Sequence, residues 1–408
     1  MKKIMLVVAS FLWTVCFTLA YIANVDAAPR AIGGFFKQVN QYNDMDRDEQ
    51  GEYQLFHMSF AGLGVNEEIR AAYPLLTQTI EKINQKEWQY AQKTRARMKK
   101  EAAGYRQESP EYYHPFEYDT DILMRRADTM AVSFLQYSYT GGSGVHGMYA
   151  WHGVNLNTVT GTELPLETVI TDQAALAEAI CERLRRDYPQ NTFEHLERTI
   201  AQRIAEGTID WTLDPQGITF YFNPYEIASY ADGLLTATIL FNEKPALFHS
   251  TYCNTPAAYA QPFIDYHPIV TSLKNNGQRD VISLRSTKEA VYVKVNGIEE
   301  AIPVPLENLK PVLIHMEDGK NYLYIDGLEP GTSFRKTLAV QIGSHSVNYL
   351  ETLPYSFRHT IAVSPAVQEY WNFLTNPNGF YFDHSSSFTS DSKTDICAIG
   401  PKGQLTFG

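Results

Sequence analysis

The stretch YTGGSGVHGMYAWHGVNLNTVTGTELPLETVI, residues 139–170, carries the clearest structural signals in the chain. Its glycines predict a turn or a close backbone approach, and the residues after them predict a strand, a tight turn and a second extended segment. The glycine run lacks the lysine and the helix entry of a phosphate-binding loop, so nucleotide binding is not expected. We therefore expect a β-rich unit with flanking helices around this stretch.

Helical and strand patterns continue on both sides. Before the stretch, Asn66 is a residue type that caps helices, and apolar residues follow it at helical spacing. After the stretch we expect two amphipathic helices, capped by Thr171 and Thr192. A hairpin is expected over residues 211–222, and a strand follows that ends near residue 241.

The last third of the chain predicts an all-β region. Residues 254–268 contain three prolines and predict a linker. Short β-favouring runs recur beyond it, and Asn296-Gly297 is a strong signal for a two-residue hairpin turn. No repeat period emerges, so we expect a sandwich or an irregular propeller-like arrangement. The expected fold class is α+β, an antiparallel sheet with packed helices, followed by an all-β C-terminal domain.

The first residues predict export. Two lysines are followed by an apolar run, residues 4–25, and Val25-Asp26-Ala27 offers the small residues that a signal peptidase reads. The run is also long enough to span a bilayer, so residues 1–27 are expected to be a signal peptide or an uncleaved anchor. The body is then extracytoplasmic: periplasmic or secreted after cleavage, and anchored in the inner membrane without it.

Net charge and cysteine content limit the partners and the chemistry. The formal net charge is −12, which disfavours nucleic acid and anionic lipid surfaces and permits basic partners. Cys181 lies on an apolar helix face and is expected to be a buried thiol, whereas a Cys253–Cys397 disulfide is left open. No Cys-x-x-Cys pair occurs, which excludes zinc-ribbon and thioredoxin-like sites.

Two motifs occur in a fixed order. The first follows the glycine run and reads Asn155-Leu-Asn157-x-x-Thr160-Gly161-x-Glu163-Leu164-x-Leu166. The second reads Tyr221-Phe222-x-x-Tyr225-Glu226-Ile227-Ala228-x-Tyr230-Ala231-x-Gly233. Their order and spacing resemble the RsiV-type extracellular domain, known as domain of unknown function 3298 (DUF3298). The resemblance places this domain at residues 139–245.

Residues 50–138 resemble the companion α+β domain, DUF4163-like, that usually precedes the RsiV-type domain. The same companion also precedes a peptidoglycan deacetylase domain of the PdaC type. The all-β C-terminal domain then occupies residues 269–408. If the resemblance holds, the strands at 154–156 and 218–222 lie in one common sheet.

The resemblance implies a ligand, because the RsiV ectodomain binds lysozyme and controls an anti-sigma factor. A lysozyme-like basic protein or peptidoglycan is therefore the expected partner. Only two lysines precede the apolar run, so we do not expect a cytoplasmic segment that holds a sigma factor. Deacetylase activity is not expected either, because the C-terminal region is β-rich and shows no metal-ligand motif.

A ligand surface is predicted around the glycine run and the second motif. Its residues are Gly142, His146, Trp151, His152, Tyr225 and Tyr230. Aromatic rings at such a surface contact sugars or anchor protein partners, although a tryptophan is more often part of a core. A metal site at His146 and His152 would need a third ligand such as Glu163 or Asp232, and surface or structural histidines are the favoured interpretation.

Three functions compete. The favoured hypothesis is an exported, non-catalytic binding or sensing protein of the cell envelope, without a metal or another cofactor. A cell-wall hydrolase is the alternative, but Asp383-His384 and the serines after it do not predict a triad, because adjacent strand residues point to opposite faces. A structural envelope protein is the third. The basic run 93–100 is interpreted as a solvated helix end rather than as a site for an anionic glycan or lipid.

Overall fold

The structure is a computed structural model that describes part of the chain. The described residues are 36–42, 45–142, 144, 146–264, 267–353, 356, 359–364, 367–371, 380–383, 394–400 and 402–407. The predicted signal peptide or anchor at residues 1–27 and the residues His384 to Ser387 lie outside these ranges. Within the ranges, every helix is too short or too polar to cross a membrane.

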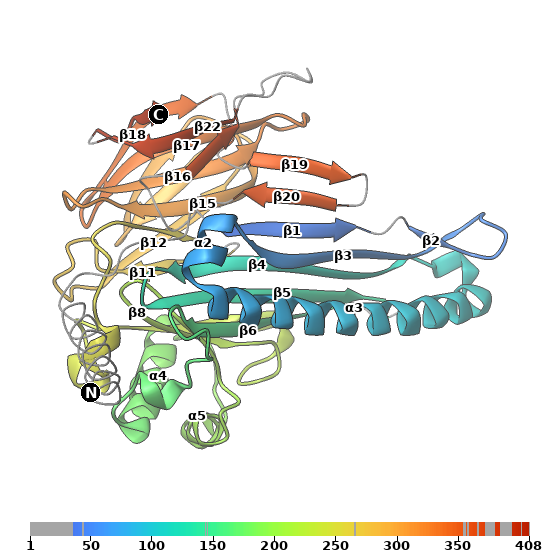
Figure 1. Cartoon of the computed structure of the whole chain (residues 1–408), viewed down its shortest axis with the longest axis horizontal. Helices are drawn as coiled ribbons and strands as arrows, with labels where there is room; N and C mark the ends of the chain where they lie inside the picture. Colours follow the sequence, from blue (N-terminus) through green and yellow to red (C-terminus); the bar gives the residue numbers. More distant parts are fainter. Residues whose placement is uncertain are drawn as a thin grey trace, which may run out of the picture.

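An eight-stranded sheet forms the centre of the molecule (Figure 1). Its strand order is β19-β20-β1-β3-β4-β5-β6, and β2 (Asp46–Arg47) pairs with β3 off this path. The other strands are β1 (Phe36–Tyr42), β3 (Gln54–Val65), β4 (Phe116–Ala127), β5 (Ala131–Gly141), β6 (Met148–Asn157), β19 (His359–Ser364) and β20 (Val367–Trp371). β3 and β4 run parallel, and the remaining pairs are antiparallel.

A long helix covers one face of this sheet. The short α2 (Glu67–Ala72) begins at Asn66, whose side chain accepts a hydrogen bond from the Ile69 amide, as predicted for a capping residue. Pro74 is the first residue of α3 (Pro74–Glu108), where its missing N–H leaves no helical hydrogen bond unmade. The apolar side chains of α3 pack with those of the sheet in two buried clusters, and α3 lies in front of the sheet in Figure 1.

A separate three-stranded sheet carries two helices. It contains β7 (Asp210–Leu213), β8 (Gly217–Phe222) and β9 (Leu235–Leu240), and it confirms the predicted hairpin. α4 (Gln173–Asp187) and α5 (Leu196–Ala205) share an apolar core with this sheet. Short 3₁₀ helices span Pro110–Tyr112, Leu166–Thr168, Tyr230–Asp232, Pro245–Leu247 and Ser250–Tyr252.

Both predicted caps of these helices are wrong in position. Asp172, not Thr171, caps α4, because its carboxylate accepts hydrogen bonds from the amides of Ala174 and Ala175. α5 begins after His195, a left-handed residue with φ of 53°, and not after Thr192.

The two family motifs lie in different sheets, which corrects the expectation of one common sheet. Within the described residues, an isolated bridge between Leu156 and Glu163 pairs with one end of the free edge of β6, and side chains occupy the rest of it. The Trp151 amide donates to Asn223 Oδ1 at 2.7 Å, and Asn223 Nδ2 donates back to the Trp151 carbonyl at 3.0 Å. The Gly153 amide donates to Asp210 Oδ1 at 3.2 Å. These bonds give backbone N–H and C=O groups at the edge of β6 their hydrogen-bond partners, and they keep the two sheets in contact.

The C-terminal region contains a sandwich of two antiparallel sheets around one apolar core. One sheet contains β10 (Tyr259–Pro262), β15 (Glu307–His315), β16 (Asn321–Leu328), β17 (Arg335–Gly343) and β18 (Ser346–Leu353). The other contains β11 (Ile269–Thr271), β12 (Asp280–Ser286), β13 (Val291–Val295) and β14 (Ile298–Ile302). A small sheet adds β21 (Phe380–Asp383), β22 (Thr394–Ile399) and β23 (Leu405–Phe407). The predicted fold class, α+β followed by an all-β region, is confirmed.

Two connections differ from the predictions for this region. β10 lies inside the expected linker and pairs with β15, so the linker is partly a strand. β20 pairs with β1, so residues near the C-terminus extend the N-terminal sheet (Figure 1). The hairpin turn is confirmed, because Asn296 and Gly297 both have the positive φ, 48° and 92°, that a type I′ turn requires.

Cys181 and Cys253 are free thiols. Cys181 is buried, as predicted, and burial raises its pKa to about 11. Cys253 is also a free thiol, so the disulfide with Cys397 that the sequence left open is not formed. Its Sγ lies 3.4 Å from the His249 carbonyl oxygen.

Candidate functional site

One face of the large sheet carries rows of acidic and aromatic side chains. Residues directly opposite one another on neighbouring strands share a face, so the strand register defines each row. The rows across β4, β5 and β6 are Asp119–Tyr139–Tyr149 and Asp121–Tyr137–Trp151. The alternate positions of the same strands, such as Tyr118 and Phe134, pack in the clusters under α3. The rows therefore face away from the helix.

Two loops extend these rows. The His146 ring stacks on Tyr230 with 3.7 Å between centroids, and the Tyr230 hydroxyl donates to the Gly147 carbonyl at 2.8 Å. The rings of Tyr225 and Tyr149 lie 5.8 and 6.1 Å from that of Tyr230. The glycine run after β5 and the connection between β8 and β9 thus meet at one aromatic cluster beside β6.

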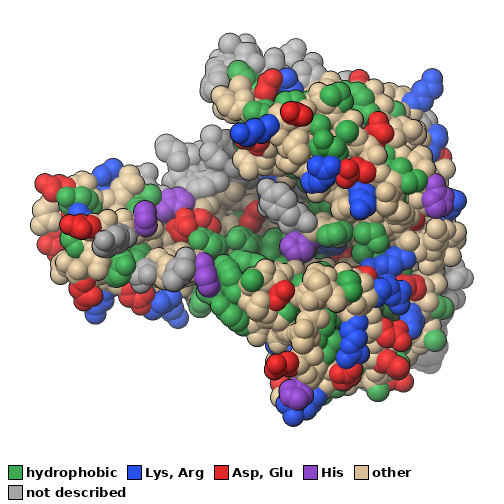
Figure 2. Space-filling model, turned by 180° about the vertical axis from the view of Figure 1, so that it is seen from behind, with side chains coloured by type: hydrophobic (Ala, Val, Ile, Leu, Met, Phe, Trp, Pro, Cys, Tyr) green, Lys and Arg blue, Asp and Glu red, His purple; other side chains and the backbone are tan. Residues whose placement is uncertain are grey.

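We call this surface the acidic–aromatic face. It comprises Glu117, Asp119, Asp121, Tyr137, Tyr139, His146, Tyr149, Trp151, Tyr225 and Tyr230. Its strand residues are half-buried, whereas Tyr225 is 62% exposed. Figure 2 shows the molecule from the side opposite α3. This side is hollowed next to the end of the molecule that projects, and hydrophobic side chains line the hollow, with acidic side chains nearby. The face is open enough to contact a ligand.

The acids and tyrosines of this face interact. Burial and the Glu117 carboxylate, which bonds to Tyr139, raise the pKa of that tyrosine. Burial raises the pKa of Asp119, although His57 Nδ1 lies 3.5 Å from its Oδ1. Carboxylates attract cations, and so do the faces of aromatic rings. The combination therefore favours a cationic group on the ligand.

The structure brings together four of the six predicted surface residues. His146, Tyr225 and Tyr230 form one cluster, and Trp151 packs on Tyr137 with 4.8 Å between ring centroids. Trp151 is also partly in the core, because it packs against a buried cluster that contains Tyr221. Trp151 therefore belongs partly to the core and partly to the surface.

The other two predicted residues lie elsewhere. Gly142 lies by the Phe116 ring, because an added Cβ would be 3.3 Å from that ring, which packs on the α3 side of the sheet. His152 lies two residues before Val154 in β6 and therefore on the same face, and Val154 packs in the core under α3. His146 precedes β6, so strand alternation does not place it with His152, and the two do not converge. Among the described residues, no group of three metal-ligating side chains occurs.

Of the strand residues of the face, sequence reasoning identified Trp151 alone. Tyr137 and Tyr139, and likewise Tyr149 and Trp151, alternate at the period of a strand, which was a usable signal. The carboxylates of β4, Glu117, Asp119 and Asp121, alternate at the same period, but only the register places them beside these rings.

His152 forms an ion pair with Asp210 at the edge of β6. The His152 Nδ1 and Asp210 Oδ1 atoms lie 2.7 Å apart, and the histidine side chain is 67% exposed. The Asp210 carboxylate raises the pKa of His152 above its ordinary value of 6.5. A raised pKa in the folded state stabilises the protein fully below pH about 6.5, and this stabilisation is lost as pH rises through the folded-state pKa.

We therefore expect His152 to titrate above pH 6.5 and to return toward that value in Asp210→Asn. Proton NMR titration of the histidine ring measures both values. Asp210→Asn is also expected to lose its stability difference from the parent chain as pH rises. A His152 that titrates at or below about 6.5 in the unaltered chain would contradict the pair.

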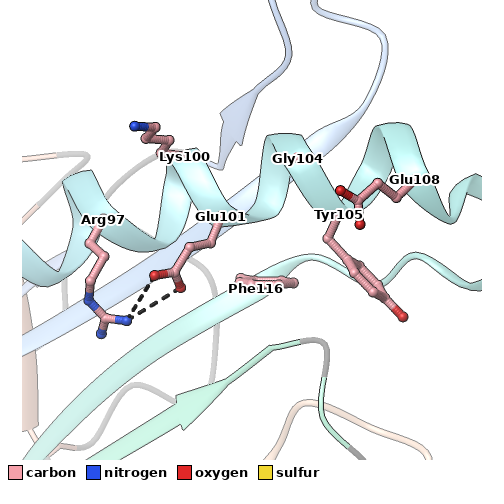
Figure 3. A pocket seen from close by; sticks show the side chains of 7 residues that line it. All are labelled: Arg97, Lys100, Glu101, Gly104, Tyr105, Glu108 and Phe116. Atoms are coloured by element: carbon pink, nitrogen blue, oxygen red, sulfur yellow. Dashed lines mark hydrogen bonds and ion pairs between the residues drawn. The ribbon is translucent and has the colours of Figure 1, made fainter.

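A second hollow lies on the α3 side of the sheet (Figure 3). It is an open pocket of about 650 Å³, lined by Arg97, Lys100, Glu101, Gly104, Tyr105, Glu108 and Phe116. Arg97 pairs with Glu101, and the lining carries charges of both signs. The pocket therefore indicates no particular ligand class.

The basic run 93–100 lies inside α3, not at its end, because the helix continues to Glu108. Arg95 and Lys99 both pair with Asp46, and Arg97 pairs with Glu101. Three of its five basic side chains are thus held in ion pairs with two carboxylates of the protein, which argues against a site for an anionic glycan or lipid.

The fold and this surface define an α+β protein with an open, acidic face and a β-sandwich attached to it. Residues 168–242 match a family described as "Protein of unknown function (DUF3298)". The chain therefore contains a DUF3298 domain, which includes α4, α5, the small sheet and the second sequence motif. The RsiV-type and companion-domain resemblances stay predictions.

Two solved structures are similar to this chain. One is a DUF3298 family member from Bacteroides fragilis, with 16% identity and a TM-score of 0.38, covering 54% of this chain and 96% of its own. The other is a DUF3298 family protein from Pseudomonas aeruginosa, with 16% identity and a TM-score of 0.34, covering 57% of this chain and 98% of its own. No curated protein matches the sequence.

Proposed function

We propose that this chain is an exported, non-catalytic binding protein of the cell envelope and that the acidic–aromatic face binds its ligand. The observation that carries the proposal is the alignment of carboxylates and aromatic rings on the sheet face opposite α3. Binding surfaces are rich in aromatic side chains, whereas sheet faces exposed only to water favour small polar ones. Export rests on the signal-like sequence at residues 1–27.

A basic protein such as a lysozyme is the ligand that the charges favour. The chain has a net charge of −12, and the face presents Glu117, Asp119 and Asp121. Complementary charge speeds the encounter of two proteins and selects the partner. Peptidoglycan, whose sugars stack on aromatic rings, is the other ligand to be tested.

We expect the purified chain without residues 1–27 to bind lysozyme, and the double variant Glu117→Gln/Asp119→Asn to bind about tenfold more weakly. Both substitutions keep the side-chain shape, so the loss comes from charge and appears mainly as slower association. Surface plasmon resonance at several salt concentrations measures the association rate, which should also depend less on salt in the variant.

Glu167→Gln/Glu178→Gln is the matched control, because it removes the same charge from exposed residues in and just before α4. It should bind like the unaltered chain. Equal losses in both double variants would mean that overall charge, not this face, attracts the ligand. If the chain binds peptidoglycan fragments but not lysozyme, peptidoglycan is the ligand. If it binds neither, the proposed binding function is wrong.

A cell-wall hydrolase is less well supported. His146 is stacked on Tyr230 and His152 lies on the other side of the sheet, so these two histidines do not form one site. Turnover of labelled peptidoglycan that is lost in His146→Ala or His152→Ala would establish the hydrolase instead. Self-association without a ligand, visible by sedimentation, would favour a structural envelope protein.

A further inference from the structure

Tyr225 has a backbone conformation that tyrosine rarely adopts. Five described residues other than glycine have a positive φ: His195, Tyr225, Asn275, Asn296 and Asn308. Asparagine and histidine tolerate this left-handed region better than most residues, whereas a bulky side chain there is an outlier. Tyr225, at φ of 70°, is therefore the strained member of the group.

The surrounding turn holds Tyr225 in this conformation. The Tyr225 amide donates to the Ala228 carbonyl at 3.1 Å, and the Glu226 amide donates to the Asn223 carbonyl at 3.1 Å. The Glu226 side chain accepts a hydrogen bond from the Asn223 amide and another from Arg203. Asn223 is itself bonded to β6 through Trp151. The backbone is thus fixed from both sides, and a glycine at position 225 would satisfy it with less strain.

The Tyr225 side chain contributes little to folding. It is 62% exposed, and its hydroxyl makes no hydrogen bond within the described part of the chain. Its ring contacts Tyr230, which in turn stacks on His146 and lies against Tyr149 of the acidic row. A strained and exposed aromatic residue with no role in the core is characteristic of a site that serves a function.

We infer that Tyr225 is the anchor of the acidic–aromatic face, presented in a strained turn so that its ring contacts a lysine or arginine side chain of a protein ligand. The inference rests on the proposed binding function. The ring face attracts such a cation, and the carboxylates of the same face, which lie beyond Tyr230 and Tyr149, add a longer-range attraction. Tyrosine is also among the residues that dominate binding energy at protein interfaces.

The test compares Tyr225→Gly with Tyr225→Ala in the chain without residues 1–27. Both variants remove the ring, but only glycine relieves the left-handed backbone. We expect the thermal midpoint of Tyr225→Gly to exceed that of Tyr225→Ala by about 2 °C. We also expect both variants to bind lysozyme at least about tenfold more weakly than the unaltered chain.

Tyr90→Ala is the matched control, because Tyr90 is 57% exposed, contacts one other tyrosine ring at 6.4 Å and lies on α3, away from the face. It should bind like the unaltered chain. Equal thermal midpoints for the glycine and alanine variants would contradict backbone strain at Tyr225. Unchanged lysozyme binding by both variants would contradict the role of Tyr225 as an anchor but would leave the proposed function intact. Failure of the unaltered chain to bind lysozyme would overturn the role of Tyr225 as an anchor for a basic protein, and failure to bind peptidoglycan as well would overturn the proposed function.

Discussion

Replacement of Asp214 by alanine is expected to lower the free energy of unfolding by about 3 to 5 kcal/mol. Asp214 lies after β7, and its carboxylate accepts two hydrogen bonds from Arg125 of β4, at 3.1 and 2.8 Å. The two side chains are 4% and 5% exposed. Alanine would leave the Arg125 guanidinium buried with no counter-charge, and this uncompensated charge is the source of the loss.

Further polar groups depend on the same carboxylate. The hydroxyls of Thr212 and Thr219 donate to it at 2.9 and 2.7 Å, and Gln261 Nε2 donates at 3.2 Å. Arg125 Nη1 also donates to the Pro262 carbonyl at 2.8 Å. Asp214 therefore joins the large sheet, the small sheet and the first strand of the sandwich. Its loss should loosen all three, and urea denaturation followed by circular dichroism measures the effect.

A double-variant cycle separates the ion pair from the rest of this network. Asp214→Asn keeps an acceptor for the two threonines, and Arg125→Met removes the buried charge. If the charge pair dominates, Arg125→Met/Asp214→Asn is more stable than the sum of the single losses predicts. Glu299→Ala, which removes an exposed pair with Arg285, is the control and should leave the denaturation midpoint nearly unchanged. A small effect of Asp214→Ala would contradict the network.

Local signals in the sequence predicted the local structure. The Asn66 cap and the turn at Asn296-Gly297 each depend on side-chain or backbone preferences within a few residues. The error in the predicted cap of α4 is also local, because it amounts to one residue. Thr171 and Asp172 are adjacent and both are residue types that favour the N-cap position, so the sequence could not separate them.

Contacts between distant residues were not predictable in this way. β20 pairs with β1 across more than three hundred residues, and no local pattern names the partner of a strand. The edge of β6 shows the same limit. The small sheet was expected to extend the large one, but Asn223 bonds to the β6 backbone in place of a strand. The candidate surface depends on the register of β4, β5 and β6, which the sequence leaves open.

Replacement of Gly153 by alanine is expected to destabilise the protein by about 3 kcal/mol or more. Gly153 lies in β6 where β7 crosses it, and an added Cβ would be 2.0 Å from the Trp211 carbonyl oxygen. A backbone atom cannot move aside as a side chain can, and the Asp210 bond to the Gly153 amide fixes the two strands at this distance. The methyl group would therefore push the two sheets apart.

Gly104→Ala is the control for this substitution, because an added Cβ at Gly104 meets no atom within 4 Å. Since Gly104 lies inside α3, alanine should raise the stability by about 1 kcal/mol there. Gly153→Ala should also weaken lysozyme binding, because Tyr225 and Tyr230 follow β8 and Tyr149 belongs to β6. The separation of the sheets would divide the acidic–aromatic face between them. A Gly153→Ala variant with unchanged stability would mean that β6 and β7 can separate freely, and a face built across both sheets would then have no fixed shape.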